Sequence, residues 1–157
     1  MFRLSLADGA SAALADMPER VRAALADKAA MLAAELQAKI EQKLSGGVLN
    51  AKTGALVRSI IAAIEESTAN ISVTVTAGAD IKYAAIHEFG GVIPPHEIVP
   101  DKARALAFLV GGKQAFAGRV QIPAVAMPER SYMRSSLAEM TDEIANAMTE
   151  AIVEAMR

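Results

Sequence analysis

The chain has only two histidines, and one of them, His87, stands directly before a glutamate, Glu88. Zinc peptidases place His-Glu-x-x-His on one helix, so that two imidazoles and a general base share one face. Here Gly91 occupies the position of the second histidine, and His96 follows two prolines, so the two imidazoles cannot share a helical face. The chain has no cysteine to serve as a further ligand. A metal-dependent hydrolase using His87, His96, Glu88 and Glu97 would need a site folded from separate segments, and it is the least favoured alternative.

The residues around His87 and Glu88 instead favour a short amphipathic turn that docks on the rest of the protein. Three large apolar side chains recur at i, i+3 and i+6: Tyr83, Ile86 and Phe89. On a helix they form one stripe, which leaves His87 and Glu88 on the other side. The pair Gly90-Gly91 is expected to end the turn, because a left-handed cap costs glycine little. A buried or helix-capping role for the His-Glu pair is the ordinary alternative to a contact with a partner.

No other pattern predicts catalysis or a cofactor. No serine lies in a Gly-x-Ser-x-Gly elbow, and Gly111-Gly112 lacks the remaining residues of a phosphate-binding loop. The carboxylate pair Glu65-Glu66 would need far more aromatic surface around it to bind a sugar, and aromatic residues make up only 4% of the chain. We therefore expect no enzyme activity, no cofactor and no metal.

Composition bounds the class of protein. The chain has 157 residues, enough for one domain, and 53% of them are hydrophobic. With no tryptophan, alanine and methionine must fill much of the core, and we expect such a chain to complete its burial against other subunits. The formal net charge of -2 argues against sequence-specific nucleic-acid binding and against an acidic membrane surface. No apolar run approaches the ~20 residues of a membrane span, and the N-terminus lacks a signal-peptide layout, so we expect a soluble protein.

Periodicity predicts two long helices. Apolar residues recur at threes and fours over residues 16–44, with Asp16 as N-cap and Pro18 in the first turn. Such a helix is roughly 40 Å long. Its stripe either lies across the chain's own sheet or meets a neighbour. A second helix is expected over 131–156, with a stripe from Leu137 to Met156. Both helices are predicted to cover one face of a sheet.

The segments between the helices predict an antiparallel sheet. Residues 2–6, 60–64 and 71–76 alternate as strands, and the last two should form a hairpin. Residues 92–99 must be extended or at an edge because of their prolines. We expect a buried strand at 105–110 paired with 118–123, a loop between them too long for a tight hairpin, and a proline-bounded link over 124–128. Phe116, on that loop, is either tucked back or offered to a partner. The prediction is a single α+β domain over residues 1–157, with an antiparallel sheet of about four to five strands.

Three segments, in order, resemble a known family. They are Leu49-x-x-x-Thr53-Gly54-x-Leu56-x-x-Ser59-Ile60, then Tyr83-Ala84-Ala85-Ile86-His87-Glu88-Phe89-Gly90-Gly91, then Ile122-Pro123-Ala124 with Pro128-x-Arg130-Ser131-Tyr132-Met133-Arg134. The pattern, which covers about residues 45–140, resembles the tail-completion, or neck, proteins of long-tailed bacteriophages and prophages. The third segment departs from the family, which usually runs Ile-Pro-Ala-Arg-Pro-aromatic almost without a break, because 125–127 separate its two halves.

The resemblance implies a small structural protein of the virion, present in the host cytoplasm during assembly. It would form a homo-oligomeric ring, commonly a hexamer, that caps the tail tube and mates with the head connector. A tail terminator or a head-closure subunit is the nearest alternative, and a DNA-facing head component is disfavoured by the net charge. The aromatic and turn-forming residues of the motifs are the expected assembly residues: Tyr83, His87, Glu88, Phe89, Gly90, Phe116, Tyr132 and Arg134.

Overall fold

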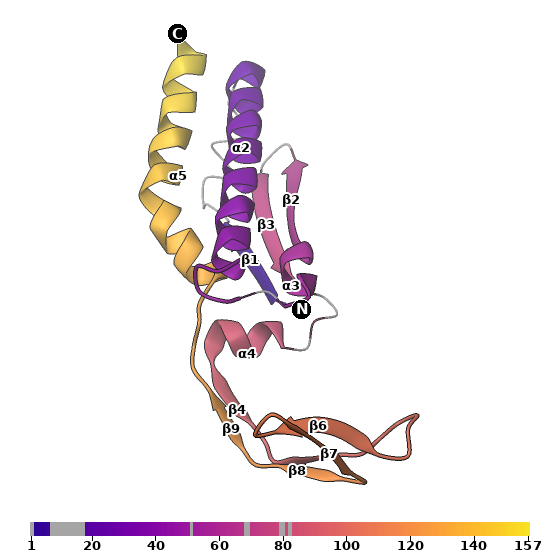
Figure 1. The fold of residues 1–157 in the computed structure, drawn as a ribbon. Helices are drawn as coiled ribbons and strands as arrows, with labels where there is room; N and C mark the ends of the chain where they lie inside the picture. The colour runs from indigo at the N-terminus through magenta and orange to yellow at the C-terminus, as the bar shows by residue number, and fades with distance from the viewer. Residues whose placement is uncertain (1, 7–17, 51, 68–69, 79–80, 82) are drawn as a thin grey trace.

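The computed structural model describes residues 2–6, 18–50, 52–67, 70–78, 81 and 83–157. Figure 1 shows two parts: a body made of two long helices and a sheet, and a slender arm of short strands that extends from one end of the body. The expected α+β class is confirmed. The predicted extent of one domain over all 157 residues stays a prediction.

The first long helix, α2 (Glu19–Leu44), is the spine of the body. It begins directly after Pro18, which precedes the first turn rather than lying in it; the predicted cap, Asp16, lies outside the described residues. One face is buried at steps of three and four, as the sequence predicted: Val21, Leu25, Ala29, Leu32, Ala33, Leu36, Ile40 and Leu44. These residues pack within the chain, in the clusters that α2 forms with the sheet and with α5. The apolar stripe of α2 is therefore buried without contact with another subunit.

The sheet of the body has the order β1-β3-β2 and is antiparallel throughout. Its strands are β1 (Phe2–Leu6), β2 (Ile60–Ser67) and β3 (Asn70–Ala77). The predicted hairpin is confirmed, with Ile60 opposite Ala77 and Ser67 opposite Asn70. A four-residue helix, α3 (Ala55–Arg58), leads into β2.

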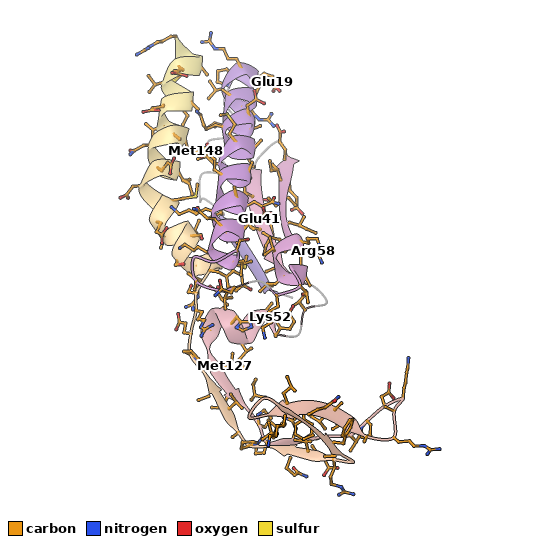
Figure 2. The ribbon with its side chains drawn as sticks, viewed as in Figure 1. Glu19, Glu41, Lys52, Arg58, Met127 and Met148 are labelled. Carbon is orange, nitrogen blue, oxygen red and sulfur yellow. The ribbon has the colours of Figure 1, made fainter. Side chains whose placement is uncertain are left out.

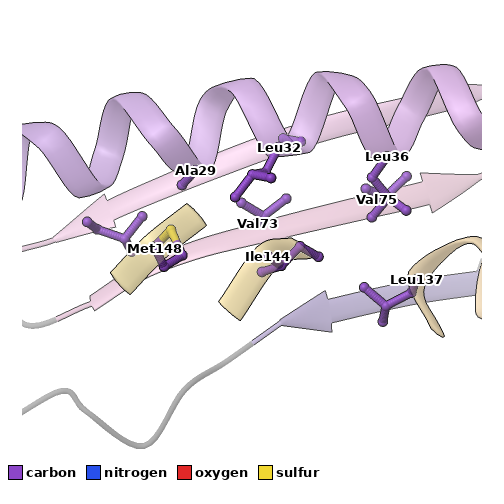
Figure 3. A pocket seen from close by; sticks show the side chains of 10 residues that line it. Ala29, Leu32, Leu36, Val73, Val75, Leu137, Ile144 and Met148 are labelled. Carbon is purple, nitrogen blue, oxygen red and sulfur yellow. The ribbon is translucent and has the colours of Figure 1, made fainter. Parts of the chain in front are cut away.

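The last helix, α5 (Met133–Met156), runs antiparallel to α2 (Figure 1). Both helices lie on the same face of the sheet, as predicted. A cavity of about 60 Å³ between them is lined by α2, β3 and α5, with Leu36, Val75 and Ile144 among its walls (Figure 3). Its lining is apolar, so it is a packing void of the core rather than a binding site.

The arm comprises residues 91–127 and is built from three successive strand pairs. Nearest the body, β4 (Gly91–Ile93) pairs with β9 (Val125–Met127). Next, β5 (His96–Ile98) pairs with β8 (Val120–Ile122). A hairpin of β6 (Leu106–Val110) and β7 (Lys113–Ala117) completes it. The short helix α4 (Ala84–Phe89) joins the arm to the body.

The arm corrects four predictions. The described sheet of the body has three strands, and the later strands form separate two-stranded ribbons rather than extending it to four or five. The strand at 105–110 exists but is largely exposed, and it pairs with 113–117 instead of 118–123. Residues 111–117 are not a long loop, and 124–128 is not only a link, since β9 lies within it.

The β6–β7 hairpin depends on a turn whose two glycines are evident in the sequence. Gly111 and Gly112 both have positive φ, 56° and 81°, which is what a two-residue type I′ turn requires. The turn lets β7 follow β6 at once and places Phe116 on a strand, with 67% of its surface exposed.

Candidate assembly site at the base of the arm

The three motif segments meet where the arm joins the body. They line one cavity of about 390 Å³, to which the first segment contributes Leu49, Thr53 and Leu56, the second Tyr83 and His87, and the third Arg130. Lys52 also lines this cavity, and Figure 2 shows its side chain beside α4, at the end of the body from which the arm extends. Segments up to about eighty residues apart in sequence therefore form one structural unit, which we call the base.

Glu88 is the centre of the base. Its side chain has no exposed surface, and its carboxylate accepts backbone hydrogen bonds from Tyr132 (2.7 Å), Met133 (2.9 Å) and Arg134 (2.9 Å). The Ser131 hydroxyl donates another at 2.9 Å. The first N–H groups of a helix have no partner inside the helix and lie at the positive end of its dipole. Glu88 thus caps α5 from 44 residues away in sequence.

The hydrogen bonds decide the ionisation of Glu88. Burial alone raises the pKa of this carboxyl, because it disfavours the charged form. The N–H groups of Met133, Arg134 and Tyr132 and the Ser131 hydroxyl favour the charged form, and together they hold the pKa of Glu88 below its ordinary value. Glu88 is therefore a carboxylate at neutral pH, and its oxygens accept hydrogen bonds from the N-terminus of α5.

Arg134 joins the two ends of the arm to this cap. Its guanidinium donates through Nε to the Glu88 carboxylate at 3.2 Å and through Nη2 to the Glu88 carbonyl at 3.1 Å. The same group pairs with Glu129 at 2.7 Å and lies 4.6 Å from the centre of the Phe89 ring. Phe89 precedes the outgoing strand of the arm and Glu129 follows the returning one, so Arg134 holds both.

Tyr132 anchors the start of α5 beneath α4. It is completely buried, and its hydroxyl donates to the Ala84 carbonyl at 3.2 Å. Burial, followed by the negative charge of Glu88, raises the pKa of Tyr132 to about 12. The phenol therefore stays neutral and keeps its hydrogen bond at physiological pH.

The two strands of the arm leave the body in close contact. Gly90 has φ +69°, and a Cβ added there would lie 2.7 Å from the backbone nitrogen of Glu129. Nearby, the backbone N–H of Arg130 donates to the His87 carbonyl at 2.9 Å. The predicted end of the turn at Gly90 is confirmed, and the structure adds its reason: only glycine fits this conformation and this crossing.

His87 lies half-buried between Tyr83 and Arg130. Its ring meets that of Tyr83 edge-on at 5.7 Å, and burial, followed by the charge of Arg130, lowers its pKa. Among the described residues, its Nδ1 has no hydrogen-bond partner. His96 lies on β5 of the arm, and the structure does not bring the two histidines together with carboxylates: within the described ranges no three metal-ligating side chains gather.

The predicted orientation of α4 was wrong. Tyr83 and Phe89, expected in the apolar stripe, are 44% and 46% exposed, whereas Glu88, which that stripe placed on the outer side, is fully buried. The alternative left open for the His-Glu pair, a buried or helix-capping role, is what the structure shows for Glu88. The carboxylate can be buried because the N–H groups at the N-terminus of α5 satisfy it, and hydrophobic periodicity in 83–91 does not reveal that partner. Ala84, which is small, fills the remaining inward position.

Of the eight expected assembly residues, the structure brings most together at the base. Glu88, Tyr132 and Arg134 contact one another through the hydrogen bonds above, and Gly90 lies beside them. Glu88 and Tyr132 are buried within the chain, where their hydrogen bonds position α4 and the start of α5. Tyr83 and Phe89 are exposed at the base, and Phe116 is exposed on the arm. The individual importance of Ser131 was not predicted, although it lay within the third motif.

In the described part of the chain no helix is long and apolar enough to cross a membrane.

Comparison with known proteins identifies a family for the chain. No curated protein and no solved structure matches the chain. A family model described as "Bacteriophage HK97-gp10, putative tail-component" matches residues 8–90, more than half of the chain. The match spans α2, the β2–β3 hairpin and α4, and it ends where the arm begins. The chain therefore belongs to the HK97-gp10-like family of bacteriophage tail components.

Proposed function

We propose that this protein completes the head-proximal end of a phage tail and joins it to the head connector, as a ring of copies of itself. Membership of a family of phage tail components supports a structural role in the virion. A tail terminator or head-closure subunit is the nearest alternative within that role. Catalysis and cofactors have no part in the proposal.

The observation that carries the proposal is the exposed apolar surface of the arm. Eight large apolar side chains on it are between 37% and 74% exposed: Val92, Ile98, Val99, Phe108, Leu109, Val110, Phe116 and Val125. A two-stranded ribbon is at best marginally stable in water, and many exposed large apolar side chains on such an element favour a contact with another protein. The arm has the composition of an element that is covered after assembly.

The base gives the arm a fixed origin for that contact. Arg134 ties both strands of the arm to the N-terminus of α5. Gly90 holds the outgoing strand against the returning one. A ring closes only when each copy is rotated by the same angle relative to the copy before it. An arm anchored at both ends by polar contacts with Arg134 meets that requirement better than a free loop would.

The experiment inactivates the gene in a phage genome that carries it and supplies the protein from a plasmid. Electron microscopy of lysates should show filled heads and separate tails when the protein is absent, and joined particles when it is supplied. Infectious particles formed at the normal yield without the protein would contradict the proposal. Loss of tails altogether would move the role to the terminator alternative.

A further inference from the structure

Charge is divided unevenly between two exposed parts of the molecule. The arm carries four basic and two acidic side chains, a formal net charge of +2, although the whole chain is at -2. Helix α5 carries one basic and five acidic side chains, a net charge of -4. Opposite charges on two surfaces favour their encounter and fix the orientation in which they meet.

The basic side chains of the arm are available for a partner. Lys102, Arg104 and Lys113 are all exposed, and in the described residues they form no ion pair or hydrogen bond through their side chains. The Arg119 side chain is 75% exposed. Within those residues its only ion pair is a 3.7 Å contact with Glu97. Lys113 lies on β7, and the other three charges flank β6 and β7 in sequence.

The outer face of α5 offers the complementary charges. Of its five acidic residues, Glu139 is paired with Lys39 and Lys43 of α2. The other four are exposed and form no ion pair with any described residue: Asp142, Glu143, Glu150 and Glu154. Val153 and Met156, 47% and 65% exposed, add apolar surface near the end of the same helix.

The two surfaces cannot meet within one copy. In Figure 1 the arm extends from the end of the body where α5 begins, and α5 runs away from it toward the opposite end. We propose that the arm of one copy lies against the outer, acidic face of α5 of a second copy. The contact joins two different surfaces of the same chain, so it is heterologous, and repetition of it closes a ring when the rotation allows. It rests on the self-assembly in the proposed function and names its interface.

A cysteine cross-linking experiment tests the contact even where assembly is transient, and the chain contains no cysteine of its own. One batch of full-length protein carries Gln114→Cys on β7, and a second carries Asn146→Cys on α5; both positions are exposed. Under mild oxidation the mixture should form the mixed disulfide about tenfold faster than a mixture with Ala34→Cys on α2, because association raises the local thiol concentration. Equal rates with the α5 and α2 partners, or faster dimerisation of the Gln114→Cys batch alone, would overturn the contact.

A charge exchange tests its chemistry. Lys102→Glu with Lys113→Glu on the arm should reduce the cross-linking rate, and so should Asp142→Lys with Glu143→Lys on α5. Mixing the two reversed proteins should restore it, whereas Glu35→Lys on the exposed side of α2 should change nothing. Failure of the paired reversal to restore the rate would overturn the proposal. These results are independent of the lysate experiment: tails that still join without this contact would refute the interface and leave the tail role standing.

Discussion

At the scale of single residues, the structure depends on one buried carboxylate. Glu88 satisfies three backbone N–H groups, a hydroxyl and a guanidinium, all from the segment that opens α5. Without it, the backbone N–H groups of Tyr132 and Met133, both fully buried residues, would lose this acceptor. A buried donor that loses its partner costs more than the bond itself contributed.

We expect Glu88→Ala to lower the free energy of unfolding by about 3 kcal/mol, within the range for breaking a buried charged network. Glu129→Ala is the matched control, because Glu129 is 55% exposed and pairs with the same arginine. It should cost less than about 1 kcal/mol, as exposed ion pairs do. Urea unfolding measures both, and equal losses for the two variants would contradict the assigned role of Glu88.

Acid should weaken the same cap. The pKa of Glu88 is lowered in the folded state, so the unfolded chain binds its proton more readily. The contribution of the Glu88 carboxylate to the free energy of unfolding is therefore complete above the ordinary pKa of 4.5. It is lost as the pH falls through the lowered pKa of the folded state. The stability difference between the natural protein and Glu88→Gln should shrink as the pH of the urea titration falls below about 4.5. A difference that stays constant down to pH 3 would exclude this linkage.

At this scale the sequence predicted the important segment but not its orientation. The turn at 83–89 and its glycine end were predicted correctly, since both depend on neighbouring residues. The side of α4 that faces inward was not predicted, because it is decided by the N-terminus of α5, 44 residues later in the sequence. The complete burial of Tyr132 was not predicted for the same reason: nothing near it in sequence shows that α4 covers it.

At the scale of elements, length decided which predictions succeeded. Helix α2 has 26 residues and repeats its apolar period many times, so its extent and buried face could be predicted. The strands of the arm have three to five residues, too few for alternation to show a face or a partner. Their pairing depends instead on the Gly111-Gly112 turn. The two positive φ angles of this turn reverse the chain into the β6–β7 hairpin, and the returning strands follow β7.

The crossing at the root of the arm gives an element-scale prediction. Gly90→Ala should destabilise the protein by about 1–3 kcal/mol, because the new Cβ would meet the Glu129 backbone at a positive φ. Gly118→Ala, also in the arm, has nothing within 4 Å of its Cβ and should leave the unfolding midpoint unchanged. Thermal unfolding of both variants decides the matter. An unchanged midpoint for Gly90→Ala would mean that the two strands do not cross as described.

At the scale of the whole molecule, the body and the arm have different physical characters. The body buries its apolar residues between two helices and a sheet, and Ile40 and Leu44 have almost no exposed surface. The arm buries little and exposes Leu109 and Phe116 to 74% and 67%. The sequence indicated that burial would be completed against other subunits, and it left open whether the stripe of the long helix meets a neighbour. The structure buries that stripe within the chain and exposes eight large apolar side chains on the arm, besides others on the body such as Met31 and Ile61.

The measurement that tests the central claim compares the solution mass of the full chain with that of a short-armed variant. Replacing residues 94–124 with Asn-Gly keeps β4 and β9 joined by a two-residue turn, because Ile93 lies opposite Val125. Light scattering over a range of concentrations should give the full chain a mass that is a multiple of 16.4 kDa, toward a ring of six, and the folded short-armed variant the mass of one copy. Two proteins that remain single copies at every concentration, or that assemble to the same extent, would contradict the account.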